Sequence, residues 1–159
     1  MVRLGPQDAG EVMTLQRAAY VMQARAHDDW DLPPLLQSLS DVAAELADPQ
    51  VVALGSRDEQ GRLVAIVRAR RAEPTSAVAD IGRLAVVPDR QGHGLGSALL
   101  AALEDQLPES VVEFRLFTGE HAVDNLRLYA RLGYTETRRE PTNSGYCIVH
   151  LRKHRHPRR

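Results

Sequence analysis

Apolar residues at helical spacing define the first long element of the chain. Val12, Leu15, Ala19 and Met22 recur every three or four residues, which is the pattern of one buried helix face. Asp8 and a glutamate three residues later are typical of a helix start. The pattern predicts a helix over about residues 9–25, then a loop over 27–34. A shorter helix is expected over 41–46, ended near Pro49.

The middle of the chain changes to short apolar runs of the β type. Runs over 51–55 and 62–71 flank a polar turn that ends in Gly61, which predicts a β-hairpin. The further expected strands lie at 2–4, 79–87, 111–117, 134–139 and 146–151.

Two more helices are expected between these strands. Leucines recur every four residues from Leu95 to Leu107, which predicts a helix with a buried stripe, closed by Pro108. A last helix is expected over 122–132, ended by Gly133. The element order predicts an α/β fold of the α+β type with a mixed sheet, because strands and helices do not alternate regularly.

Length and charge narrow the class of protein. The chain has 159 residues and a formal charge of −1, which fits one domain and argues against broad nucleic-acid binding. No apolar run approaches the ~20 residues of a membrane span, and no signal peptide is evident. We expect a cytoplasmic protein with one domain over 1–152 and a frayed basic tail over 153–159. A single cysteine, Cys147, excludes an intrachain disulfide, and we expect it to be packed rather than nucleophilic.

The segment over 81–96 joins a predicted strand directly to a predicted helix and contains Gly92, Gly94 and Gly96. Glycines let the backbone curl with its N–H groups inward, and a helix start adds unpaired donors, so this segment predicts a phosphate cradle. A P-loop would need a lysine after the last glycine, and a dinucleotide fingerprint would need a glycine where Ser97 stands. Both of those sites are excluded.

Two motifs in register resemble one enzyme family. The run Gln91-Gly-His-Gly-Leu-Gly96 resembles the Gln/Arg-x-x-Gly-x-Gly/Ala pyrophosphate loop of the GNAT acetyltransferase superfamily, and the strand before it resembles that family's strand 4. Asn125, Tyr129 and the pair Gly133-Tyr134 resemble the family's later Asn-x-x-x-Tyr-x-x-x-Gly-Tyr/Phe segment. The resemblance spans about residues 81–134.

This resemblance implies both a fold and an activity. The fold would be the GNAT fold, with a mostly antiparallel sheet of about seven strands, about four flanking helices, and a bulged strand 4 that splays from strand 5. The activity would be direct transfer of an acetyl group from acetyl-CoA, the cosubstrate, to a primary amine of a small molecule, peptide or protein. The residues implied in binding acetyl-CoA are Leu84, Ala85, Val86, Gln91, Gly92, His93, Gly94, Leu95, Gly96, Ser97, Asn125 and Tyr129.

The resemblance also implies catalytic roles. Tyr129 would be the general acid for the departing thiolate, since a phenol can donate a proton to it. The general base stays open between Asp80, Glu120 and His121. No cluster of residues has metal-ligand spacing, so no metal is expected.

The acceptor site is expected in the N-terminal half and the last hairpin. Residues that could line it, with carboxylates that favour a cationic amine, are Tyr20, Asp28, Asp29, Trp30 and Asp31. The alternative for that loop is a set of solvated acids around one packed tryptophan. A noncatalytic acyl-CoA-binding module and a transferase of longer acyl groups are the rival functions. Whether the chain forms a homodimer stays open.

Overall fold

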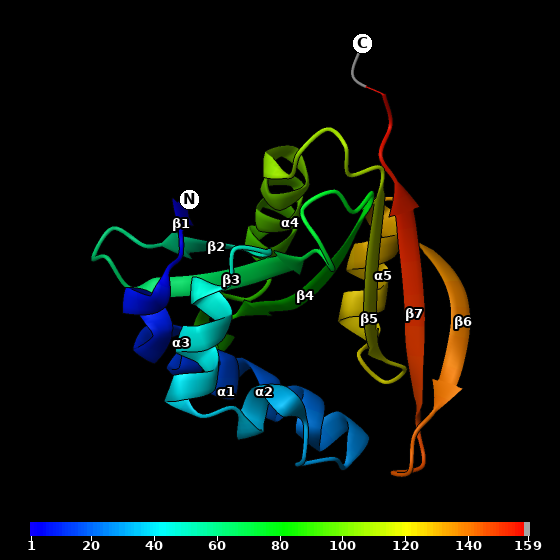
Figure 1. Ribbon diagram of the computed structural model, residues 1–159. Helices are drawn as coiled ribbons and strands as arrows, with labels where there is room; N and C mark the ends of the chain where they lie inside the picture. Colours follow the sequence, from blue (N-terminus) through cyan, green and yellow to red (C-terminus); the bar gives the residue numbers. More distant parts are fainter. Residues whose placement is uncertain (158–159) are drawn as a thin grey trace.

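The computed structural model describes residues 1–157 as one seven-stranded sheet with helices on both faces (Figure 1). The strand order is β1-β2-β3-β4-β5-β7-β6. The strands are β1 (Val2–Arg3), β2 (Val51–Arg57), β3 (Leu63–Arg70), β4 (Val78–Val86), β5 (Glu113–Gly119), β6 (Thr135–Pro141) and β7 (Cys147–His154). The helices are α1 (Ala9–His27), α2 (Pro33–Leu36), α3 (Leu39–Ala47), α4 (Leu95–Gln106) and α5 (Val123–Arg131). This architecture confirms the expected fold class.

Strands β4 and β5 form the parallel pair in a sheet whose other described pairs are antiparallel. Their ladder is short, running only from Val78 opposite Glu113 to Asp80 opposite Arg115. Both strands continue well past that point without pairing to each other. They therefore diverge, as expected, and the free edges of the two strands border an opening in the sheet.

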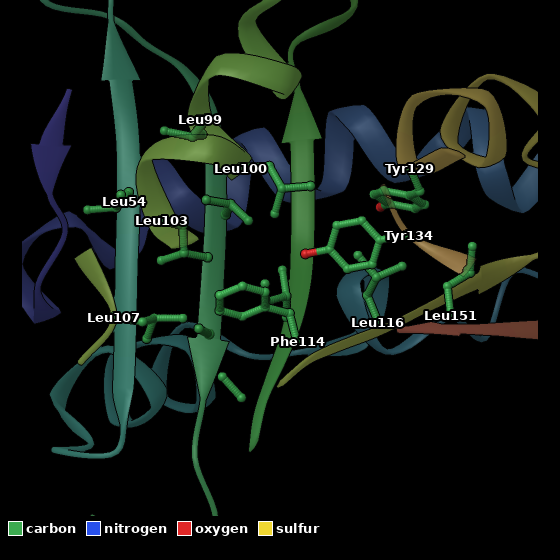
Figure 2. Close-up of a cluster of buried hydrophobic side chains, with 14 of the residues drawn as sticks. Leu54, Leu99, Leu100, Leu103, Leu107, Phe114, Leu116, Tyr129, Tyr134 and Leu151 are labelled. Carbon is green, nitrogen blue, oxygen red and sulfur yellow. The ribbon is translucent and has the colours of Figure 1, made fainter. Parts of the chain in front are cut away.

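The core lies in two layers, one on each face. Leu99, Leu100 and Leu103 of α4 are fully buried against the sheet, together with Phe114 of β5 and Tyr129 of α5 (Figure 2). This confirms the predicted leucine stripe, whose residues each stabilise the fold by about 1.5–3 kcal/mol on burial. The second layer joins α1 and α3 to the opposite face.

Several boundaries differ from the sequence-based expectation. Helix α1 continues to His27, two residues beyond its predicted end, and Asp28 ends it in the left-handed conformation. The expected loop that follows contains the one-turn helix α2, which begins with a Pro pair suited to a helix start.

Strand β7 continues to His154, past the expected domain boundary at 152, because β5 offers partners as far as Glu113. Arg155 then donates hydrogen bonds to main-chain carbonyls of Glu104, Leu107 and Pro108. The start of the expected basic tail is thus ordered against α4, and residues 158–159 of that tail lie outside the described residues.

Candidate active site

A cleft of about 700 Å³ opens where β4 and β5 diverge. It is bordered by one face of α1, the end of β4, the glycine loop that leads into α4, and the segment from His121 to Arg131. Its lining residues therefore come from α1 on one face of the sheet and from α4 and α5 on the other.

The glycine loop has the geometry expected of an anion cradle. Gly92 and Gly94 have φ values of 81° and 78°, and a side chain added at either would meet nothing within 4 Å. Gly94 is the residue that caps α4, so the unpaired N–H groups of the helix start face the same space. The Gln91 side chain holds the loop to the strand by donating to the Val86 carbonyl at 3.2 Å. The loop thus presents backbone donors to an open volume.

Gly96 has a different role from the other two glycines. A side chain added there would lie 3.4 Å from Leu128 of α5 and close to Val86 of β4. Gly96 is buried, and a Cβ there would make ordinary van der Waals contact with both neighbours, so it belongs to the packing of α4 rather than to the open cradle.

Most of the residues predicted to bind the cosubstrate lie together. Ten of the twelve line the cleft: Leu84, Ala85, Val86, Gln91, Gly92, Gly94, Leu95, Gly96, Ser97 and Asn125. His93 is exposed at the tip of the loop and does not line the cleft, and Tyr129 lies beneath its wall.

Three cationic residues of the cleft were not predicted. Arg90, Arg127 and Arg131 line it, beside the glycine loop and on α5. Arg127 and Arg131 are four residues apart on one helix, so they share a face. The sequence contains that spacing, but it does not stand out because arginines are spread along the whole chain.

Tyr129 is buried, with 5% of its surface exposed, and its ring lies 5.9 Å from that of Tyr134 (Figure 2). Its hydroxyl forms no hydrogen bond with the described residues. Burial, with a smaller effect of Tyr20, raises the pKa of Tyr129 well above that of an ordinary tyrosine. Tyr20 itself lines the cleft, so the two phenols lie within electrostatic range across its wall. Tyr129 is therefore a neutral hydrogen-bond donor at physiological pH.

The three candidate bases lie in different surroundings. His121 lines the cleft. Asp80 is exposed at the closed end of the split, where β4 still pairs with β5. Glu120 accepts a hydrogen bond from the Cys147 N–H at 2.6 Å and lies 3.6 Å from Arg139, so it fixes the start of β7. Among the three, His121 has direct access to the cleft.

His27 connects the end of α1 to the loop after β5. Its Nδ1 lies 2.8 Å from the Gln23 carbonyl, which can only accept, so Nδ1 carries the proton. Its Nε2 then accepts from the His121 N–H at 3.0 Å. A side chain at Gly119 would overlap the His27 ring, so that glycine makes room for it. Sequence reasoning missed this contact, which spans 94 positions.

The acceptor loop is only partly as expected. Tyr20 lines the cleft, whereas Asp28 and Asp31 are exposed and not part of it. Asp29 accepts a hydrogen bond from the Tyr146 hydroxyl at 2.6 Å, which ties the loop to the β6–β7 hairpin. Trp30 is 51% exposed, so the alternative of a packed tryptophan is wrong.

No cluster of three or more histidine, cysteine or acidic side chains within residues 1–157 could hold a metal ion. No helix among those residues has both the length and the apolar character needed to cross a bilayer. Cys147 is partly buried in β7.

Known structures share this fold. Ribosomal-protein-S18-alanine N-acetyltransferase from Escherichia coli superposes with a TM-score of 0.77 at 21% identity, covering 96% of this chain and 91% of that one. An acetyltransferase from Thermus thermophilus has a TM-score of 0.74 at 18% identity, with 96% and 94% coverage. NAA60 from Arabidopsis thaliana, solved with a bisubstrate analogue, has a TM-score of 0.72 at 16% identity, with 96% and 95% coverage.

Sequence comparison identifies the family. No curated protein sequence matches the chain significantly. The family model for the Acetyltransferase (GNAT) family matches residues 11–134, which is most of the chain and contains both the glycine loop and the Tyr129 segment. The chain therefore belongs to the GNAT acetyltransferase family.

Proposed function

We propose that this protein is an N-acetyltransferase that moves an acetyl group from acetyl-CoA directly to a primary amine. The observation that carries the proposal is the cleft in which the glycine loop and the start of α4 meet the free edge of β4. The family supplies acyl transfer in general, and the amine acceptor and the direct mechanism are proposed here.

The residues present fit acetyl-CoA, which supplies an activated thioester when bound. The open cradle at Gly92 and Gly94 would hold the pyrophosphate through backbone N–H groups, with the cleft arginines as counter-charges. Ser97 and Asn125 would bond the pantetheine arm or the adjoining backbone.

The free edge of β4 would polarise the thioester carbonyl. Beyond Asp80, the β5-facing backbone groups of β4 have no ladder partner. Backbone N–H groups from Leu84 to Val86 would therefore be available in the cleft as fixed donors. Such donors stabilise developing negative charge more than mobile water does, because they need no reorganisation.

Proton movement would involve the cleft-side residues. Tyr129 would donate to the departing sulfur, and its raised pKa keeps the proton on the phenol until then. His121 has the access that the base needs, and Asp80 or Glu120 would act through water. An attacking amine must lose its proton, since amines near pKa 10 are mostly charged at neutral pH.

The deciding experiment measures free CoA thiol with acetyl-CoA and a panel of amines. The panel should include small amines, amino acids, peptides with free N-termini and lysine-containing peptides with blocked N-termini. We expect amine-dependent thiol release and an acetylated product by mass spectrometry. Tight CoA binding without turnover on the whole panel would instead indicate a noncatalytic acyl-CoA-binding module. A cytoplasmic location and the lack of nucleic-acid, membrane or metal partners stay predictions from the sequence.

A further inference from the structure

Strand β4 contains a bulge immediately before the residues that line the cleft. Ile66 of β3 pairs with Ala85, and Arg68 pairs with Gly82, so Arg83 and Leu84 together face the single residue between them on β3. Arg83 has a φ of 55°, in the left-handed region that residues with a side chain rarely adopt. Such bulges re-aim a side chain, and they are common next to active sites.

The bulge changes the face on which Arg83 lies. Ile81 and Leu84 pack into the core layer under α4 and α5. Arg83 instead borders a small gap under α1 and α3 on the opposite face, together with Gln16, Glu45 and Arg68. The strained backbone at Arg83 thus brings its side chain to the α1 side of the sheet.

The polar groups around Arg83 already have partners of their own. Glu45 forms an ion pair with Arg68 through one oxygen and accepts from Gln37 through the other at 2.9 Å. Gln16 donates to Gln37 at 2.9 Å and to the Pro34 carbonyl at 3.0 Å. Glu45, the acid that borders the same gap as Arg83, is therefore committed to another arginine.

Arg83 has no such partner. Within residues 1–157 it forms no hydrogen bond and no ion pair, and its Nε is fully buried without an acceptor. A buried donor without an acceptor costs free energy, and so does a left-handed arginine, unless a bound group compensates for them. The guanidinium fork matches a carboxylate, which can accept two parallel hydrogen bonds.

Arg83 also lies next to the proposed reaction centre. It directly precedes Leu84, which lines the cleft, while Arg83 itself borders the gap beside it. Burial raises the pKa of Tyr20, which lines the cleft, and the positive charge of Arg83 partly opposes that rise. An anion bound by Arg83 would therefore lie on the α1 side of the split, where an acceptor amine could reach the thioester from the face opposite α4.

We propose that Arg83 binds a carboxylate of the acceptor, so that the substrate is an amine that also carries a carboxylate, such as an amino acid. This inference rests on the proposed N-acetyltransferase function and names the class of its acceptor. Arg83 acts as a specificity-determining residue, and the chemistry of transfer does not depend on it.

The test compares amino acids with their own amides, which have the same size but lack the negative charge. Because an amide also changes the reactivity of the amine, the quantity measured is the acid-to-amide ratio of kcat/KM in each variant. We expect Arg83→Gln to lower that ratio about tenfold or more, through a higher KM for the acid at unchanged kcat. Values for the amide should stay within about twofold. Arg83→Lys should retain part of the ratio, because it keeps the charge and loses the fork.

Arg152→Gln is the matched control, because it removes an exposed arginine of β7 that does not line the cleft. Its ratio should equal that of the unmodified protein. An unchanged ratio in Arg83→Gln, or an equal loss for acid and amide, would overturn the inference and leave the proposed function intact.

If no amine on the panel is acetylated, the proposed function fails separately. Calorimetry with an amino acid and its amide in the presence of CoA then still tests whether Arg83 binds a carboxylate. Binding of the acid that disappears in Arg83→Gln supports it, and equal binding of acid and amide refutes it.

Discussion

At the scale of single residues, Tyr129 shows how a buried side chain can remain chemically available. Its ring belongs to the core layer beside α4, yet its hydroxyl has no hydrogen-bond partner among the described residues (Figure 2). The neighbouring Tyr134 has a fully buried hydroxyl that also lacks a partner. The two rings are tilted by 59° with their centroids 5.9 Å apart, and they are equally buried, which makes them a natural pair for comparison.

Replacing Tyr129 by phenylalanine removes only the proposed proton donor. We expect kcat to fall about 100-fold, because general acid catalysis typically contributes that much or more. The affinity for acetyl-CoA should change less than about twofold, since the hydroxyl is not part of the phosphate cradle. Steady-state thiol release and equilibrium binding measure the two quantities.

Tyr134→Phe is the control for loss of a buried hydroxyl. It should keep full turnover and raise the free energy of unfolding by about 1 kcal/mol, because it removes a buried hydroxyl without a partner. Normal turnover in Tyr129→Phe would show that another group protonates the sulfur.

At the scale of elements, the start of α4 carries the phosphate cradle. Gly92 and Gly94 have positive φ values, which favour glycine, and the space beyond them is open. The function of the loop therefore depends on both conformation and room, and the two can be separated by comparison with a glycine elsewhere.

We expect Gly94→Ala to weaken acetyl-CoA binding about tenfold or more, since its methyl group would enter the space of the phosphates. It should also cost about 1 kcal/mol of stability, because alanine is strained at this φ. Gly61→Ala is the matched control, with a φ of 83° and equally open space in the β2–β3 turn. Both variants should lose similar stability in urea unfolding, and only Gly94→Ala should lose affinity. Equal affinities would exclude the loop as the cradle.

Local sequence patterns predict these elements well, because their causes are local. The leucine spacing of α4, the glycine run before it and the turn at Gly61 each depend on residues only a few positions apart. The family resemblance implied a bulge in this strand, but its position at Arg83 was not predicted, since that depends on the register between β3 and β4 rather than on any local motif. The same holds for the contact of His27 with the loop after β5. The cradle was therefore readable from the sequence, whereas most of the acceptor side was not.

At the scale of the whole molecule, the divergence of β4 and β5 divides the sheet into two parts that other contacts must join. On the α4 face, Lys153 of β7 bonds Glu104 of α4 at 2.7 Å. On the α1 face, His27 accepts a hydrogen bond from the His121 N–H, and Tyr146 donates one to Asp29. These long-range pairs connect the two parts of the sheet that border the cleft.

The Tyr146–Asp29 contact predicts how stability depends on pH. Burial first, and then the bond to Asp29, raises the pKa of Tyr146 to about 12, whereas an unfolded tyrosine titrates near 10. Stability from this group is therefore complete below about pH 10 and is lost as the pH rises toward 12. The hydrogen bond from Tyr146 is the main cause that lowers the pKa of Asp29. The stability that the Asp29 carboxylate contributes to the fold is therefore present above about pH 4 and is lost as the pH falls through the lowered pKa.

Tyr146→Phe should therefore destabilise the protein most in the middle of the pH range. We expect a loss of about 1 kcal/mol near pH 7, because one hydrogen bond to a partly exposed carboxylate disappears. The difference from the unmodified protein should shrink toward pH 12 and again below pH 4. Other buried tyrosines titrate equally in both proteins, so urea unfolding of the pair at pH 3, 7 and 11 isolates this contact. A difference that stays constant across the three pH values would show that the contribution of the Tyr146 hydroxyl does not depend on the ionisation of Tyr146 or Asp29.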